Sequence, residues 1–173
     1  MILNNVGYPA FYGKPDLRKK EKIMTEKEKQ ILNNIESLVK GKKDKNEILK
    51  EVVRILKESF SHYTWVGIYL LEENELVLGP FLGEPSPHTR IKLDKGICGA
   101  AAREKETVIV PDVNADPRYL ACSLETKSEI VVPIMKGEKV FGEIDIDSDK
   151  PDAFGGNDKK LLEKIAQILA EIF

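Results

Sequence analysis

Apolar side chains recur at helical spacing in two segments near the start of the chain and in one at its end. The first segment, 25–39, opens with a Thr-x-x-Glu capping box, and the second runs from about 46 to 60. The third covers 157–173, with Asn157 as the expected N-cap. The pattern therefore predicts three helices, each with one apolar face available for packing.

Between these helices the pattern changes to the alternation that is typical of strands. The runs 64–72 and 75–83 are separated only by Glu73 and Asn74, which predicts a hairpin, and a second hairpin is expected within 128–148. Short strands are expected at 90–93 and 107–112, and a helix rich in small residues is expected between them, at 96–105. These elements predict an α+β fold with a mostly antiparallel sheet of five or six strands, flanked by helices.

The domain organisation follows from where this periodicity begins. Residues 1–24 contain Tyr, Pro, Gly and Asn without a regular pattern and are interpreted as an N-terminal extension. Residues 25–173 are expected to form a single domain with its own core. The irregular connection 113–126 is long for a compact domain, so it is a candidate for carrying function.

Composition narrows the class of protein. The 173 residues carry a formal net charge of −2, with 42% hydrophobic and 32% charged residues. This balance predicts no nucleic-acid partner and no membrane partner. The chain contains no apolar run of membrane-spanning length, no signal-peptide pattern and no phosphate-binding loop, so a cytoplasmic location is expected.

Three carboxylates alternate along one predicted strand, in the segment FGEIDIDSD. Side chains on a strand alternate between faces, so Glu143, Asp145 and Asp147 point one way, and the two isoleucines between them point to the core. Glu129 opens the other strand of the same hairpin, so cross-strand pairing can place a fourth carboxylate beside them.

This acidic face has two interpretations. In the first, it simply meets water, as one side of an antiparallel sheet often does. Alternatively, crowded carboxylates require a hard metal ion, the ammonium group of a ligand, or a proton held by an acid with a raised pKa. A metal ion would need a tighter set of oxygens than this spacing suggests, and His62 and His88 lack partners at ligand spacing, so no metal site is predicted.

Cys98 and Cys122 are the only cysteines, and 122 − 98 = 24 residues separate them. Two cysteines are too few for a disulfide scaffold, and they are interpreted either as buried apolar thiols or as a redox pair. Cys98 lies at the start of a predicted helix, whose dipole is expected to favour the thiolate.

Six segments in one order, between Tyr63 and Phe173, resemble the GAF-domain free methionine-(R)-sulfoxide reductases. They read WVGIYLL, LVLGPFLG, GICGAA, LACS, SEIVVPI and EIDIDS. Several segments together are more specific than any one of them, because GAF domains share a fold and diverge in their pockets. The resemblance implies a GAF fold and an enzyme, without a cofactor, that reduces free methionine-(R)-sulfoxide.

The resemblance also implies which side chains bind the substrate. Glu129, Asp145 and Asp147 match the family's pocket carboxylates, which bind the substrate and can supply a proton. Trp65 and, less directly, Tyr69 match aromatic positions near the methylsulfinyl group, although ordinary core packing would also explain both.

In the family's chemistry, Cys122 would attack the sulfoxide sulfur and become a sulfenic acid, and Cys98 would condense with it to form a disulfide. Thioredoxin or a similar dithiol would then reduce the disulfide. Many relatives carry a further cysteine where this chain reads EPSPHT, so either Cys98 alone resolves the sulfenic acid or recycling follows another route. The alternative is a non-catalytic GAF module that senses a small ligand, and a homodimer is expected through 1–17 and 25–39.

Overall fold

The computed structural model describes residues 23–41, 44–121 and 123–173. The helices are α1 (Glu26–Lys40), α2 (Lys45–Ser59), α3 (Gly96–Glu104) and α4 (Gly156–Leu169), with two short 3-10 helices, η1 (Val113–Ala115) and η2 (Ala170–Ile172). The strands are β1 (Trp65–Glu72), β2 (Glu75–Leu82), β3 (Arg90–Lys92), β4 (Val108–Val110), β5 (Ser128–Lys136) and β6 (Lys139–Ser148).

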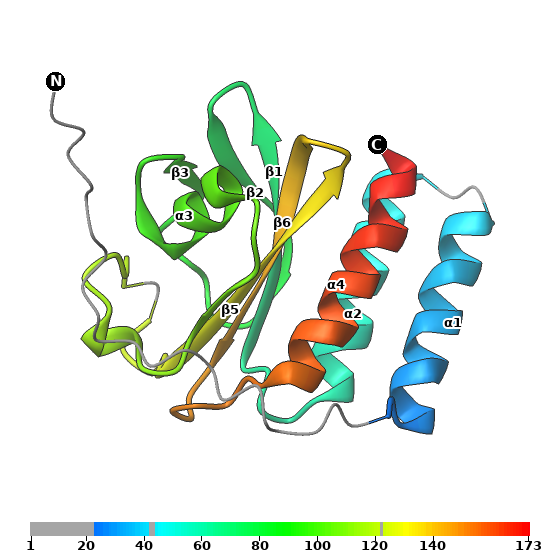
Figure 1. The fold of residues 1–173 in the computed structure, drawn as a ribbon, viewed down its shortest axis with the longest axis horizontal. Helices are drawn as coiled ribbons and strands as arrows, with labels where there is room; N and C mark the ends of the chain where they lie inside the picture. The colour runs from blue at the N-terminus through cyan, green and yellow to red at the C-terminus, as the bar shows by residue number, and fades with distance from the viewer. Residues whose placement is uncertain (1–22, 42–43, 122) are drawn as a thin grey trace, which may run out of the picture.

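The six strands of the described ranges form one antiparallel sheet in the order β3-β2-β1-β6-β5-β4. Helices α1, α2 and α4 stand on one face of the sheet, whereas α3 lies on the opposite face (Figure 1). The predicted α+β fold with a mostly antiparallel sheet and flanking helices is therefore confirmed.

Each face of the sheet has its own apolar core. Ile144 and Ile146 of β6 join the larger core under α1, α2 and α4. Trp65, Tyr69 and Val131 point to the other face, where they join the smaller core with residues of α3. The alternation along the strands thus decides which side chains meet α3.

The helix boundaries follow local hydrogen bonds. The predicted capping box of α1 is present, since the Thr25 hydroxyl accepts the Glu28 N–H at 3.2 Å. The expected N-cap of α4 at Asn157 is wrong, because the Asp158 carboxylate accepts the Gly155 N–H at 2.9 Å and Gly155 is the N-cap. None of the helices in the described ranges combines the length and the apolar character that crossing a membrane requires.

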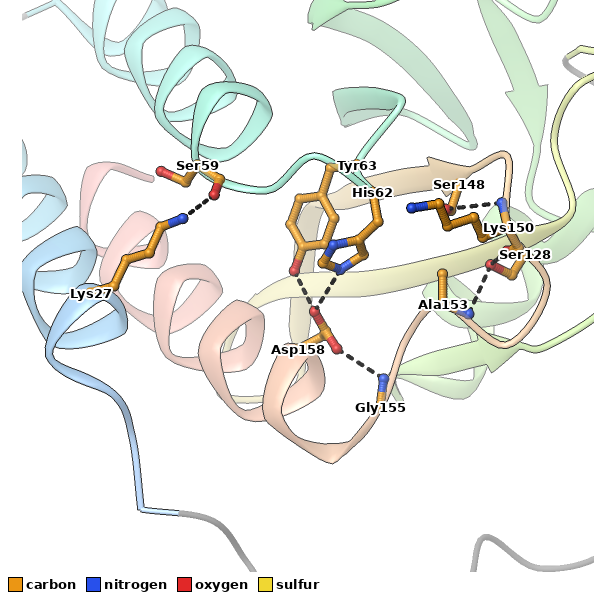
Figure 2. A network of polar contacts seen from close by, with 10 residues as sticks. All are labelled: Lys27, Ser59, His62, Tyr63, Ser128, Ser148, Lys150, Ala153, Gly155 and Asp158. Carbon is orange, nitrogen blue, oxygen red and sulfur yellow. Dashed lines mark hydrogen bonds and ion pairs between the residues drawn. The ribbon is translucent and has the colours of Figure 1, made fainter.

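Polar contacts fix the start of β1 against α4 (Figure 2). The Tyr63 hydroxyl donates to Asp158 Oδ1 at 2.8 Å, and His62 Nε2 lies 3.4 Å from the same oxygen. Burial, followed by the charge of Asp158, raises the pKa of Tyr63 far above its ordinary value. In the same region, the Ser128 hydroxyl donates to the Lys150 carbonyl at 2.7 Å, which ties β5 to the turn after β6.

Strands β1 and β6 approach each other closely at Gly142. A Cβ built at this glycine would lie 2.2 Å from the Tyr69 carbonyl oxygen, which is backbone and has little freedom to move. We expect Gly142→Ala to lower the free energy of unfolding by roughly 3 kcal/mol, measured by urea denaturation. Gly156→Ala is the matched control, since nothing lies within 4 Å of its Cβ position. A denaturation midpoint as unaffected by the Gly142 change as by the control would contradict this close approach.

Candidate functional site

The register of three adjacent strands gathers the acidic side chains. Trp65 pairs with Asp147, and Tyr69 pairs with Glu143, across β1 and β6. Glu129 pairs with Asp147 across β5 and β6. Directly paired residues share a face, so the carboxylates lie together on the α3 side of the sheet, between the aromatic positions of β1 and the side chains of β5. The sequence-based placement of Glu129 beside the acidic face is confirmed.

The four carboxyl groups of this acidic cluster, Glu129, Glu143, Asp145 and Asp147, are buried. Their exposed fractions are 4%, 0%, 2% and 3%, in that order. The interpretation of a face open to water is therefore wrong, because α3 and the segment after β4 pack over it. Both carboxylate oxygens of Glu143, and Oδ1 of Asp145, have no hydrogen-bond partner among the described residues. Such groups are costly to bury unless a ligand or a proton satisfies them.

Helix α3 brings a thiol onto the acidic cluster. Cys98 Sγ lies 3.5 Å from Asp145 Oδ2 and 4.0 Å from Glu129 Oε1. Gly99 lets this helix pack closely on the turn after β3, since a Cβ there would lie only 2.7 Å from the Leu93 carbonyl oxygen. The resemblance placed Cys98 and these acids in one site, and the fold brings them into contact.

The surroundings of Cys98 oppose ionisation of its thiol. Burial raises the pKa of Cys98 well above its ordinary value, and the charges of Asp145, Glu143 and Glu129 raise it further. The expectation that the helix dipole favours the thiolate is therefore wrong. A terminal dipole contributes about 0.3–1 kcal/mol, which desolvation and neighbouring carboxylates outweigh here. Cys98 is a neutral thiol at neutral pH.

The carboxyl groups themselves have raised pKa values, and burial is the main cause for each. The pKa of Asp145 is raised to about 7. The pKa values of Glu129, Glu143 and Asp147 lie well above their ordinary range, with the charge of Asp145 as the next cause. Asp145 thus ionises first, while its neighbours keep their protons. The cluster combines one carboxylate that can bind a cation with several acids that can donate a proton.

The two predicted aromatic residues lie beside the acidic cluster with their polar ends fixed. The Trp65 indole lies over Gly67, where a Cβ would approach it to 2.2 Å, and its Nε1 donates to the Glu84 carbonyl at 3.0 Å. The Tyr69 hydroxyl donates to the His88 carbonyl at 2.8 Å. Both rings therefore pack in the core and also lie beside the acidic cluster.

Cys122 lies outside the described residues, but the chain before it is placed. A Cβ at Gly96 would lie 3.0 Å from Leu120 Cδ1, so Leu120 lies over the start of α3. The Ala121 carbonyl oxygen lies 3.2 Å from His88 Nε2. The chain that leads to position 122 thus passes the start of the helix that carries Cys98. That the Cys122 sulfur faces the acidic cluster stays a prediction.

Comparison with known proteins places this chain in a family. The sequence model for the GAF domain matches residues 44–172. The chain belongs to the GAF domain family. GAF domain-containing protein A of Dictyostelium discoideum is 43% identical to this GAF domain over 145 residues, which are 83% of this chain and 90% of the relative.

Free methionine-R-sulfoxide reductases are among the relatives of this GAF domain, which confirms the resemblance. The Saccharomyces cerevisiae enzyme is 50% identical over 109 residues, and the match covers 61% of this chain and 60% of that protein. The X-ray structure of the Neisseria meningitidis enzyme in complex with its substrate superposes with a TM-score of 0.79 and 36% identity, covering 87% of this chain and 91% of the other.

The resemblance left Glu143 of this GAF domain without a role. Its place in the alternating acidic segment was visible in the sequence, and that pattern is the signal that could have marked it as a site residue. The structure shows it fully buried and on the same face as Asp145. A complete account of the site therefore includes a fourth carboxyl group.

Proposed function

We propose that this GAF domain reduces free methionine-(R)-sulfoxide to methionine, with thiols as the reductant. The observation that carries the proposal is the contact between the Cys98 thiol and the buried acidic cluster, at 3.5 Å from Asp145. This arrangement supplies what the reaction needs: a carboxylate for the substrate's ammonium group, acids that hold protons, and a thiol. The named activities of the relatives supply the substrate.

The acidic cluster would select the free amino acid. The ammonium group of free methionine sulfoxide is expected to pair with Asp145, which ionises first, and to contact Glu129 and Asp147. A methionine sulfoxide within a protein lacks this ammonium group and would leave buried acids without a partner. Trp65 and Tyr69 then enclose the methylsulfinyl end of the substrate.

The first chemical step uses Cys122. Its thiolate attacks the sulfoxide sulfur, the sulfur–oxygen bond of the substrate breaks as the oxygen moves to Cys122, and methionine leaves with the electron pair. A proton from a neutral carboxyl group, Glu129 or Asp147, completes the sulfenic acid on Cys122. Cys98 is unsuited to this attack, because its raised pKa keeps it a thiol.

The second step uses Cys98. Its sulfur displaces the hydroxyl group of the sulfenic acid, so that a disulfide forms and water leaves. The thiol proton passes by way of Asp145, whose Oδ2 lies 3.5 Å from Cys98 Sγ, to the displaced hydroxyl group, which leaves as water. A dithiol of low potential, such as thioredoxin in the cytoplasm, would reduce the disulfide and restore the protein.

A homodimer formed through α1 is a further proposal. Ile31 and Ile35 of α1 are already buried in the core with α2 and α4. Its exposed surface carries the ion pairs Lys29–Glu26 and Lys40–Glu36, so a partner would meet a polar surface. The other part of the predicted interface, 1–17, lies outside the described residues.

Substrate selectivity tests the proposed function directly. With a dithiol reductant, we expect turnover of free methionine-(R)-sulfoxide. For the N-acetylated sulfoxide, we expect kcat/KM to be lower by a factor of about 100 or greater. The free (S)-sulfoxide is the matched control for the stereochemistry. Methionine formation is measured directly by chromatography. Tight binding of the (R)-sulfoxide without any methionine formed would overturn the proposal and favour the sensor alternative.

A further inference from the structure

Three possible ligand atoms of a metal ion converge at Cys98. Cys98, Glu129 and Asp145 each offer one atom, and these atoms all lie within 4.8 Å of one another. The sulfur lies 3.5 and 4.0 Å from the two carboxylate oxygens. In a tetrahedral zinc site, bonds of about 2.3 Å to sulfur and about 2.0 Å to oxygen place these ligands about 3.5 Å apart. The separations therefore suit a small tetrahedral cation.

A further buried carboxyl group lies on the same face, beside these three ligands. Glu143 is fully buried, and both of its carboxylate oxygens lack a hydrogen-bond partner among the described residues. It stands two residues before Asp145 on β6, on the same side of the sheet, and its charge acts on Cys98. Oδ1 of Asp145 is likewise without a partner in the described ranges. These unsatisfied oxygens are independent evidence for a ligand beside the thiol.

We propose that Cys98, Glu129 and Asp145 bind a divalent cation of the zinc type, beside the unsatisfied carboxyl group of Glu143. The sequence predicted no metal site because the oxygens of the acidic segment alone are spaced too widely. Helix α3 adds a sulfur, and β5 adds a second carboxylate, so the tertiary structure provides a tighter set of ligands. A divalent cation would also neutralise the crowded carboxylates.

The ligand types determine which ions this site accepts. A thiolate with two carboxylates favours Zn²⁺ or Co²⁺ over Mg²⁺, which requires six oxygen ligands in an octahedral arrangement. Binding displaces the thiol proton of Cys98 and the protons of the carboxyl groups, so affinity rises with pH. If the proposed function holds, a bound ion occupies Cys98 and the substrate carboxylates together, and it acts as a reversible inhibitor.

Titration with Co²⁺ alone tests this metal site. The full chain carrying Cys122→Ser is used in reduced form, so that Cys98 is the only thiol and no intramolecular disulfide can form. We expect a sulfur-to-cobalt charge-transfer band and intense visible bands typical of tetrahedral cobalt, at one ion per chain. Zn²⁺ should remove these bands, whereas excess Mg²⁺ should leave them unchanged.

Further variants in the same background identify the ligands. Cys98→Ser should abolish the charge-transfer band, and Glu129→Gln should weaken Co²⁺ binding roughly tenfold or more. Glu106→Gln, a change at an exposed carboxylate, is the control that should leave binding unchanged. A charge-transfer band that survives Cys98→Ser, or a weak octahedral spectrum in the parent protein, would overturn the metal site. Because the readout is spectroscopic, this outcome is distinct from failure of the proposed reductase activity.

Discussion

Steady-state reduction of free methionine-(R)-sulfoxide is expected to fall by roughly 10³-fold or more when Cys122 is replaced by Ser. Loss of an attacking nucleophile removes the covalent step itself, and binding alone does not restore it. Cys98 is not expected to take over, because burial and the neighbouring acids keep it protonated. The measurement is methionine formed per chain with excess dithiol. Full activity in the Cys122→Ser variant would show that the proposed nucleophile is wrong.

Cys98→Ser is the matched variant and should fail at a different step. Without added dithiol, we expect it to form one methionine per chain, as the parent does, but to stop at the sulfenic acid instead of the disulfide. A reagent specific for sulfenic acids should label the variant and leave the parent unlabelled. If the variant forms no methionine at all although its circular dichroism is native, then Cys98 participates in the attack and the order of the steps is incorrect.

The free energy of unfolding is expected to decrease as the pH rises from about 4 to about 7. Asp145 in the unfolded chain loses its proton near pH 3.9, whereas in the folded chain it holds the proton up to about pH 7. Over this window the folded state binds more protons, so stability falls with increasing pH. At about 1.4 kcal/mol per pH unit, the raised pKa of Asp145 alone lowers the free energy of unfolding by roughly 4 kcal/mol across this window.

Urea denaturation at a series of pH values checks this dependence. The raised pKa values of Glu129, Glu143 and Asp147 should extend the decline above pH 7. Asp145→Asn should flatten the curve between pH 4 and 7, because the amide does not titrate. Glu138→Gln is the control, since the hydrogen bond and charge of Lys105 lower the pKa of this exposed carboxylate. Stability that rises steadily across this window would contradict the assignment of neutral buried acids.

Local sequence patterns determined the elements of this protein and the faces of its strands. The alternation in FGEIDIDSD determined that the acids of β6 lie on the face opposite Ile144 and Ile146, because successive side chains of a strand point in opposite directions. The pairing of the two strands in the hairpin determined that Glu129 lies on the same face as these acids. These features depend only on neighbours along the chain or across one turn, so they were readable before the fold was known.

Only the tertiary structure decided what covers the acidic face and what this does to its chemistry. Whether a polar strand face meets water depends on an element distant in the sequence, and here α3 and the segment after β4 bury it. That burial reversed the expected pKa shift of Cys98 and left Glu143 without a partner among the described residues. Desolvation and close approach between separate elements determine these properties, and a one-dimensional pattern does not contain them.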